Sequence, residues 1–282
     1  MRKTINKLFL IITVISALLL TTGCDLFIKT NKGQVDQKWY MGLTYEDDNG
    51  NDTDYTIGTD GTIAAVALED GYGDEFGIIK GEEAYLNINT IIKNIDKRFY
   101  VDATNNLVMF TDATKTYKTK IGGKTINETE NTDYVISFMD GKNCYVNVKF
   151  VKKYVDFDYK VVKAEGKSPA RIVLKYTSGE KNQMTVKSNI EMRTKADYQN
   201  LIVTTLKKNT KVTVLEESGD WTKVGTDDGF MGYVPAKKLK DKETKKTEFK
   251  SDADTYTHVL MNKKISLGWN AITNLTANGN LE

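Results

Sequence analysis

Short runs of alternating apolar and polar residues recur along most of this chain, and clusters of Gly, Asn and Asp separate them. Such runs, rich in Val, Ile, Thr and Tyr, are typical of β-strands that bury one face. Only two prolines occur among the 282 residues, against 15 tyrosines. The pattern therefore predicts a mainly β protein with short helices, and the length allows one to three domains.

One pattern occurs twice, about 60 residues apart. Residues 79–102 (IKGEEAYLNINTIIKNIDKRFYVD) align without a gap on residues 139–162 (MDGKNCYVNVKFVKKYVDFDYKVV). Each copy predicts a turn glycine, an alternating strand, a short helix and a strand hairpin. The glycines are Gly81 and Gly141, the strands cover residues 84–88 and 144–148, and the helices cover residues 89–95 and 149–155.

Cysteine and histidine are too scarce for several kinds of site. Cys144 aligns with Ala84 of the first copy, which predicts a small buried residue rather than a nucleophile. His258 is the single histidine, so copper, zinc and Cys–His sites are not expected. The acidic stretch at residues 44–66 lacks the spacing of a calcium loop. The sequence predicts no metal and no cofactor, and a carboxylate-only hydrolase remains a formal possibility.

The repeated unit resembles the copper amine oxidase N-terminal-like domain, which is common as paired halves in secreted Firmicute proteins. The resemblance rests on the Tyr-(Val/Leu)-Asn-(Val/Ile) strand and the helix that follows it, and it covers about residues 78–176. It implies a scaffold or wall-contacting α+β module over residues 78–178, without copper despite the name. Residues 24–77 then form an N-terminal β-rich segment.

From residue 184 to residue 240, short strands alternate with polar turns. About 55 residues of five short strands must remove their edges to be stable, which predicts a closed small barrel. This stretch resembles the bacterial SH3-like domain, to which we assign residues 183–240. The resemblance rests on residues 189–193, 206–214, 219–224 and 232–234.

The SH3-like resemblance implies binding of peptidoglycan or its stem peptides in a groove lined by aromatic rings. Trp221 and Tyr233 are the candidates, because flat rings stack on sugar faces or peptide planes while offering a polar edge. Trp221 could instead anchor the barrel core. Arg193 is either a ligand contact or a surface residue near the first turn. Thr194 and Lys195 replace the Ser-Gly pair that usually follows it, which leaves the ligand open.

The N-terminus carries a secretory leader, residues 1–23. Three basic residues precede an apolar stretch, residues 8–20, that is shorter than the ~18 residues of a spanning helix. The sequence LTTGC that ends at Cys24 resembles a bacterial lipobox, with Thr21 where Leu is usual. The resemblance implies cleavage before Cys24 and acylation of its thiol, which would hold the chain on the outer face of the cytoplasmic membrane. The alternative is a plain signal peptide or an uncleaved anchor.

The charge balance excludes one class of partner. The leader holds three of the 40 basic residues and none of the 38 acidic ones, so the mature chain is nearly neutral. No nucleic-acid partner is therefore expected. With Cys24 acylated, Cys144 has no partner for a disulfide. We expect a monomer in the cell envelope.

The C-terminal part reads as a linker and a tail. Residues 237–250 carry seven lysines against three acidic residues without apolar periodicity, which predicts a solvated linker over residues 241–255. Residues 265–269 (ISLGW) predict a buried strand. The order of modules resembles secreted proteins that continue into a family 18 glycoside hydrolase barrel, with residues 256–282 as its truncated start. The Asp-x-x-Asp-x-Asp-x-Glu pattern of that family is absent.

The expected architecture is therefore an α+β repeat module followed by a small SH3-like β-barrel and a C-terminal orphan strand. The leading hypothesis is a non-catalytic, lipid-anchored envelope protein that binds peptidoglycan or its stem peptides. One alternative is an N-terminal fragment of a family 18 glycoside hydrolase that acts on wall or spore glycan. The other is an extracellular protein–protein adaptor.

Overall fold

The computed structural model describes residues 30–250. The leader at residues 1–23, Cys24 and the tail at residues 256–282 lie outside the described residues. Within them the protein is mostly β with short helices, as the alternation of apolar and polar positions predicts. No helix in this part of the chain combines the length and the hydrophobicity needed to cross a membrane.

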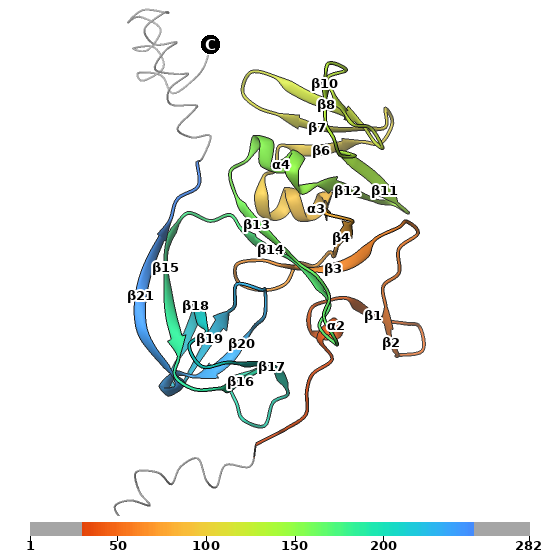
Figure 1. The fold of residues 1–282 in the computed structure, drawn as a ribbon. Coiled ribbons are helices and arrows are strands. Elements are labelled where there is room, and N and C mark those ends of the chain that lie inside the picture. The colour runs from red at the N-terminus through yellow and green to blue at the C-terminus, as the bar shows by residue number, and fades with distance from the viewer. Residues whose placement is uncertain (1–29, 251–282) are drawn as a thin grey trace, which may run out of the picture.

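The first large sheet belongs to a module that we call the repeat module, residues 62–175 (Figure 1). Its strand order is β11-β12-β5-β4-β3-β14-β13, and only β14 and β3 run parallel. Helices α3 and α4 lie between a smaller sheet, β6-β7-β8, and strands β3 and β4 (Figure 1). The bounds are β3 Thr62–Ala67, β4 Gly77–Lys80, β5 Glu83–Asn87, α3 Ile88–Thr90, β6 Phe99–Asp102, β7 Leu107–Thr111, β8 Thr116–Lys120, β9 Thr125–Ile126, β10 Glu130–Asn131, β11 Ser137–Asp140, β12 Asn143–Asn147, α4 Val148–Tyr154, β13 Asp158–Val162 and β14 Ala170–Lys175.

The two sequence copies adopt the same local structure and lie side by side. β5 and β12 pair antiparallel, with Leu86 opposite Val146. Asn87 and Asn147 each end a strand, are fully buried, and accept a hydrogen bond from the backbone N–H two residues on, at 2.9 and 2.8 Å. Such capping begins the short helix that follows each strand. The copies differ in that the first continues into a π-helical turn, Ile91–Ile95, where the second forms α4.

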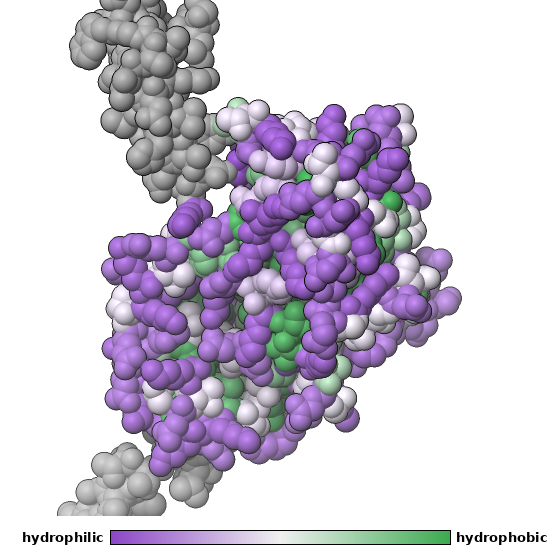
Figure 2. Space-filling view, turned by 45° about the horizontal axis from the view of Figure 1, so that its top comes forward, coloured by the Kyte–Doolittle hydropathy of each residue, from purple (hydrophilic) through white to green (hydrophobic). Residues whose placement is uncertain are grey.

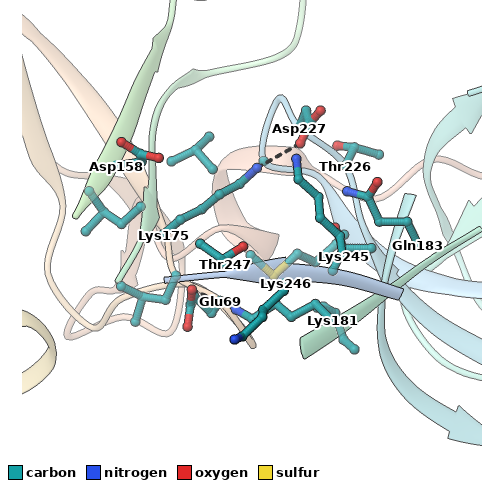
Figure 3. A pocket seen from close by; sticks show the side chains of 18 of the residues that line it. Glu69, Asp158, Lys175, Lys181, Gln183, Thr226, Asp227, Lys245, Lys246 and Thr247 are labelled. Atoms are coloured by element: carbon teal, nitrogen blue, oxygen red, sulfur yellow. Dashed lines mark hydrogen bonds and ion pairs between the residues drawn. The ribbon is translucent and has the colours of Figure 1, made fainter. Parts of the chain in front are cut away.

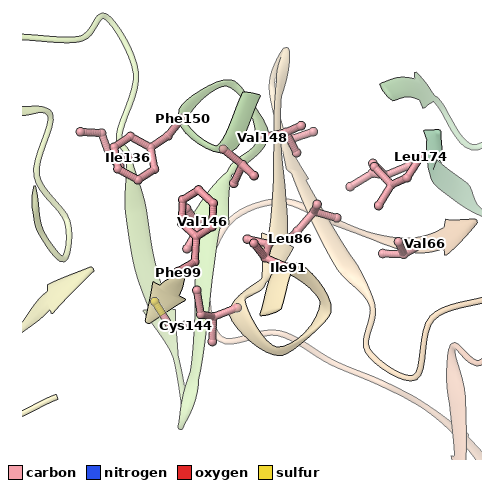
Figure 4. Close-up of a cluster of buried hydrophobic side chains, with 14 of the residues drawn as sticks. Val66, Leu86, Ile91, Phe99, Ile136, Cys144, Val146, Val148, Phe150 and Leu174 are labelled. Carbon is pink, nitrogen blue, oxygen red and sulfur yellow. The ribbon is translucent and has the colours of Figure 1, made fainter. Parts of the chain in front are cut away.

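The core of the repeat module is filled from both copies (Figure 4). Leu86 and Val146 project from the paired strands, and Phe150 of α4 meets Phe99 of β6 with ring centroids 6.2 Å apart. Cys144 is 3% exposed within this cluster, as predicted. Burial raises the pKa of its thiol to about 11, so the reactive thiolate is scarce near neutral pH.

The second large sheet forms what we call the barrel module, residues 179–247 (Figure 1). Its strand order is β17-β16-β20-β19-β18-β15-β21, with all neighbours antiparallel. Every strand contributes an apolar side chain to one buried cluster, so the sheet curls around a single core: Val186, Met192, Val203, Val212, Val224, Val234 and Leu239. The bounds are β15 Gly179–Val186, β16 Ile190–Arg193, β17 Ile202–Leu206, β18 Lys211–Ser218, β19 Trp221–Gly225, β20 Met231–Pro235, a 3-10 turn Ala236–Lys238, and β21 Leu239–Thr247.

The predicted linker over residues 241–255 is wrong for its first part. β21 pairs with β15 from Val186↔Leu239 to Gly179↔Thr247, and Leu239 is buried in the barrel core. Most other β21 side chains are exposed. Backbone hydrogen bonds can hold an edge strand without an apolar face, and lysines on such an edge oppose pairing with other chains. A lysine-rich edge strand therefore carries no hydrophobic signal in the sequence.

The predicted N-terminal segment, residues 24–77, is not separate from the two modules. β3 lies between β4 and β14, inside the large sheet of the repeat module. Before it lie α2 Gln37–Tyr40 and a hairpin of β1 Thr44–Glu46 and β2 Asp52–Asp54. Ahead of α2, the N–H of Val35 donates to the carbonyl of Ile202 at 2.9 Å, so the chain covers the free edge of β17.

The two modules pack against each other through a shared core and through polar contacts. One buried cluster contains Ile78 and Tyr145 of the repeat module together with Val224 of the barrel module. The hydroxyl of Tyr72 donates to the carbonyl of Gly229 at 3.0 Å. Burial raises the pKa of Tyr72, so it remains a neutral donor at physiological pH. The face in Figure 2 is mostly hydrophilic, with a patch of hydrophobic residues near its middle.

Candidate functional site

Trp221 opens β19 and lies on the outer face of the barrel module. Thr222 and Val224 are buried toward the core, and alternation along a strand puts Trp221 on the opposite face. The alternative in which Trp221 anchors the barrel core is therefore wrong, because apolar side chains from all seven strands already fill that core. The Trp221 ring is partly buried and meets the Tyr198 ring edge-on, with centroids 4.8 Å apart.

Tyr198 belongs to the loop between β16 and β17, and the sequence analysis did not single it out. Its carbonyl accepts the N–H of Asn31 at 2.9 Å, and its ring lies 5.9 Å from the guanidinium of Arg193. These contacts hold the ring against Trp221 although the loop has no regular structure. The sequence feature that could have identified Tyr198 is its position as a single aromatic residue in the polar stretch TKADYQN, residues 194–200.

A groove of about 420 Å³ borders this aromatic pair. Tyr198 lines it directly, and so does Pro235, which lies opposite Trp221 in the pairing of β19 with β20. The groove residues come from the start of the described chain and from four parts of the barrel module: Thr30, Asn189, Ile190, Glu191, Tyr198, Thr205, Pro235 and Lys238.

The groove carries both signs of charge beside an apolar wall. The Glu191 carboxylate pairs with Lys32 at 2.9 Å and with Arg193, while Lys238 lies on the same groove. Ile190 and Pro235 add apolar surface. Concave sites that combine apolar surface with a few polar groups suit small ligands. Among residues 30–250, no group of three or more His, Cys, Asp or Glu could hold a metal ion.

Arg193 is not placed to contact a ligand. Its side chain is among the largest that are fully buried, with the residue 1% exposed. The guanidinium donates to the carbonyl of Asn31 at 2.9 Å and to that of Asn200 at 2.6 Å, and it pairs with Glu191. Neither sequence alternative, ligand contact or surface residue, describes this position. Arg193 instead joins the N-terminal strand-like segment to the loop that carries Tyr198.

Tyr233 shares the outer face with Trp221 but points toward a different neighbour. It lies opposite Lys223 on β19 and opposite Arg193 on β16, so Trp221 is its diagonal neighbour. Burial raises the pKa of Tyr40 to about 12, with the nearby Tyr233 adding to the effect. Tyr233 is not among the groove residues, and the ring that lines the groove is that of Tyr198.

A comparison with protein-family models matches residues 188–240 to the bacterial SH3 domain. The match falls inside the barrel module and contains Trp221, Tyr198 and Pro235. A bacterial SH3 domain supports a role in binding cell-wall or protein partners. Searches of the curated proteins and of the solved structures found no match. The resemblance of the repeat to the copper amine oxidase N-terminal-like domain stays a prediction.

Proposed function

We propose that the barrel module binds peptidoglycan or its stem peptides in the groove beside Trp221 and Tyr198. The observation that carries this proposal is the edge-on pair of two partly buried rings at the border of a groove of about 420 Å³. Aromatic rings stack on the faces of sugars and peptide planes, and the flanking Glu191 and Lys238 can accept from or donate to polar groups of either ligand. The proposed role is non-catalytic.

Trp221→Ala is expected to weaken binding to insoluble peptidoglycan about tenfold, which corresponds to about 1.4 kcal/mol. The reason is that truncation removes the ring that meets Tyr198 at the border of the groove and frees Tyr198 from its ring contact. Binding is measured by co-sedimentation, with thermal unfolding showing that the variant stays folded.

Trp39→Ala is the matched control, because Trp39 is 54% exposed on α2 and its ring, unlike that of Trp221, does not meet the groove residue Tyr198. This variant should bind as the unaltered chain does. Equal losses in both variants, or full binding by Trp221→Ala, would overturn the proposed site. Failure of the unaltered chain to sediment with peptidoglycan would instead favour a protein partner.

We also propose that acylated Cys24 holds the chain on the outer face of the cytoplasmic membrane. The support is the LTTGC sequence after a short apolar stretch. Two acyl chains, at ~0.8 kcal/mol for each buried CH₂, suffice for stable attachment. Cys24→Ser is expected to move the protein from the membrane fraction to the medium and to abolish labelling by a fatty-acid probe. A variant that stays labelled would contradict this proposal.

A further inference from the structure

A second candidate site lies where the barrel module faces the repeat module (Figure 3). Strands β18, β15 and β21 present one sheet face to a cavity of about 350 Å³. On this face Gln183 is opposite Thr213, and Lys181 is opposite Lys245. Strand β14 of the repeat module supplies the other wall, through Val173 and Lys175.

The pairing of Lys181 with Lys245 breaks a general preference of sheets. Like charges directly opposite each other on neighbouring strands are destabilising. Glu69 neutralises Lys181 at 2.7 Å. Lys245 forms no ion pair within the described part of the chain, and its side chain extends into the cavity toward Asp227 and Lys175 (Figure 3). Departures of this kind from the general rules of sheet pairing are expected at functional sites.

Several lysines lie around Asp227. Lys175 pairs with Asp227 at 3.0 Å, and this contact lowers the pKa of Asp227, to which Lys160 and Lys245 also contribute. Lys160 lines an adjoining cavity of about 330 Å³ that shares Lys175 and Asp227 with the first. Lys175, Lys181 and Lys245 thus line the first cavity together with Asp227 and Glu69, and Lys160 lies in the adjoining cavity.

The remaining carboxylates of the cavity wall have ion-pair partners of their own. Asp158 is paired with Lys152 at 3.0 Å, and Glu248 is paired with Lys246. Lys175 and Lys181 are likewise paired, with Asp227 and Glu69, so Lys245 is the lysine of this cavity wall that is left to pair with an incoming anion. A partly enclosed setting strengthens such an interaction relative to bulk water.

The uncharged residues of the cavity wall indicate which class of ligand would bear the anionic group. Val173, Leu215 and Met231 form an apolar floor. The Gln183 side chain offers an amide and Thr213 a hydroxyl, the groups that bind peptide N–H and C=O. No aromatic ring lines the cavity of about 350 Å³, so it lacks the surface on which sugars stack.

We propose that this junction binds the terminal carboxylate of a short peptide with small apolar side chains. The carboxylate lies between Lys245 and Lys175, and the apolar side chains cover Val173 and Leu215. The peptide class rests on the proposed wall-binding function, because wall stem peptides are the nearest source of such a terminus. The binding position at Lys245 and Lys175 does not depend on the groove beside Trp221.

The experiment titrates the purified full-length chain with N-acetyl-D-alanyl-D-alanine and follows backbone amides by NMR. Shifts are expected at Gln183, Thr213 and Lys245, and 0.5 M salt should weaken the binding, since the added salt screens it. The C-terminal amide of the same dipeptide should bind at least about fivefold more weakly, because it lacks the charge. Lys245→Gln should weaken binding of the free acid about tenfold.

Lys242→Gln is the matched control, because Lys242 lies on β21 but alternation places it on the opposite face from Lys245. It should leave the affinity unchanged. Equal binding of the acid and the amide, or no effect of Lys245→Gln, would overturn the proposal, as would binding of glycerol phosphate without binding of the dipeptide. Trp221→Ala should not change this titration, so failure here is distinguishable from failure of the wall-binding groove.

Discussion

A chain that ends at Lys238 is expected to unfold about 5–15 °C below the chain that ends at Lys250. The first chain lacks β21, whose Leu239 is 3% exposed in the barrel core. Loss of one buried leucine side chain alone costs about 2–5 kcal/mol, and each kcal/mol lowers the melting temperature of a domain this size by about 2–4 °C. Removal of β21 also leaves β15 as an unpaired edge.

Thermal unfolding followed by circular dichroism provides the measurement. The chain that ends at Lys250 keeps β21 and is the matched control for loss of the residues beyond it. Equal melting temperatures for the chains ending at Lys238 and Lys250 would show that the segment behaves as a linker after all.

Arg193→Met is expected to lower the free energy of unfolding by about 3 kcal/mol. Methionine keeps much of the side-chain volume but removes every hydrogen bond of the guanidinium. The carbonyls of Asn31 and Asn200 then lose their donor, and Glu191 keeps only the exposed Lys32. Each buried carbonyl left without its donor costs about 1–3 kcal/mol, so the loss of two such bonds accounts for the expected difference.

Urea unfolding at neutral pH measures this difference, and hydrogen exchange localises it. The amides of Asn31 and Val35 should exchange faster in Arg193→Met, because both bond to the segment that Arg193 holds in place. Lys195→Met is the control, since Lys195 is an exposed cation in the loop that follows Arg193 and carries Tyr198. It should change stability by less than about 0.5 kcal/mol. A similar loss from both substitutions would remove the special role of Arg193.

Substitutions at Trp221 and at Arg193 should affect wall binding and stability differently. Trp221 lies on the outer face, so its truncation should affect ligand binding more than folding. Arg193 is buried and touches no groove ligand directly, so its replacement should affect folding first. If binding falls in Arg193→Met, the cause is displacement of Tyr198, whose loop Arg193 joins through Asn200.

Local sequence patterns were sufficient to predict the strands that bury one face and the helices that begin with a capping residue. The alternation from Ala84 to Ile88 marks a strand because one face is buried, and the equivalent Asn87 and Asn147 mark the helix starts because capping is a local interaction. The spacing of aromatic and turn residues likewise identified the barrel module. Trp221 and Tyr233 could be selected as ring-bearing positions for the same reason.

Features that depend on contacts between residues far apart in the sequence could not be predicted from local patterns. β21 is a strand because β15 offers a backbone edge some 60 residues earlier in the sequence, and backbone hydrogen bonds carry no side-chain signature. Arg193 is buried because Asn31 lies over it, and Tyr198 becomes part of the groove because its loop folds back on Trp221.

The boundary between these two groups follows the range of the interactions. Strand alternation, turns, caps and the repeat depend on neighbours within a few residues. They can therefore be predicted from the amino-acid sequence alone. The groove beside Trp221, the buried Arg193 and the lysine-rich junction around Lys245 each need residues from separate segments. Their chemistry arises only when the folded chain excludes water and brings those segments together.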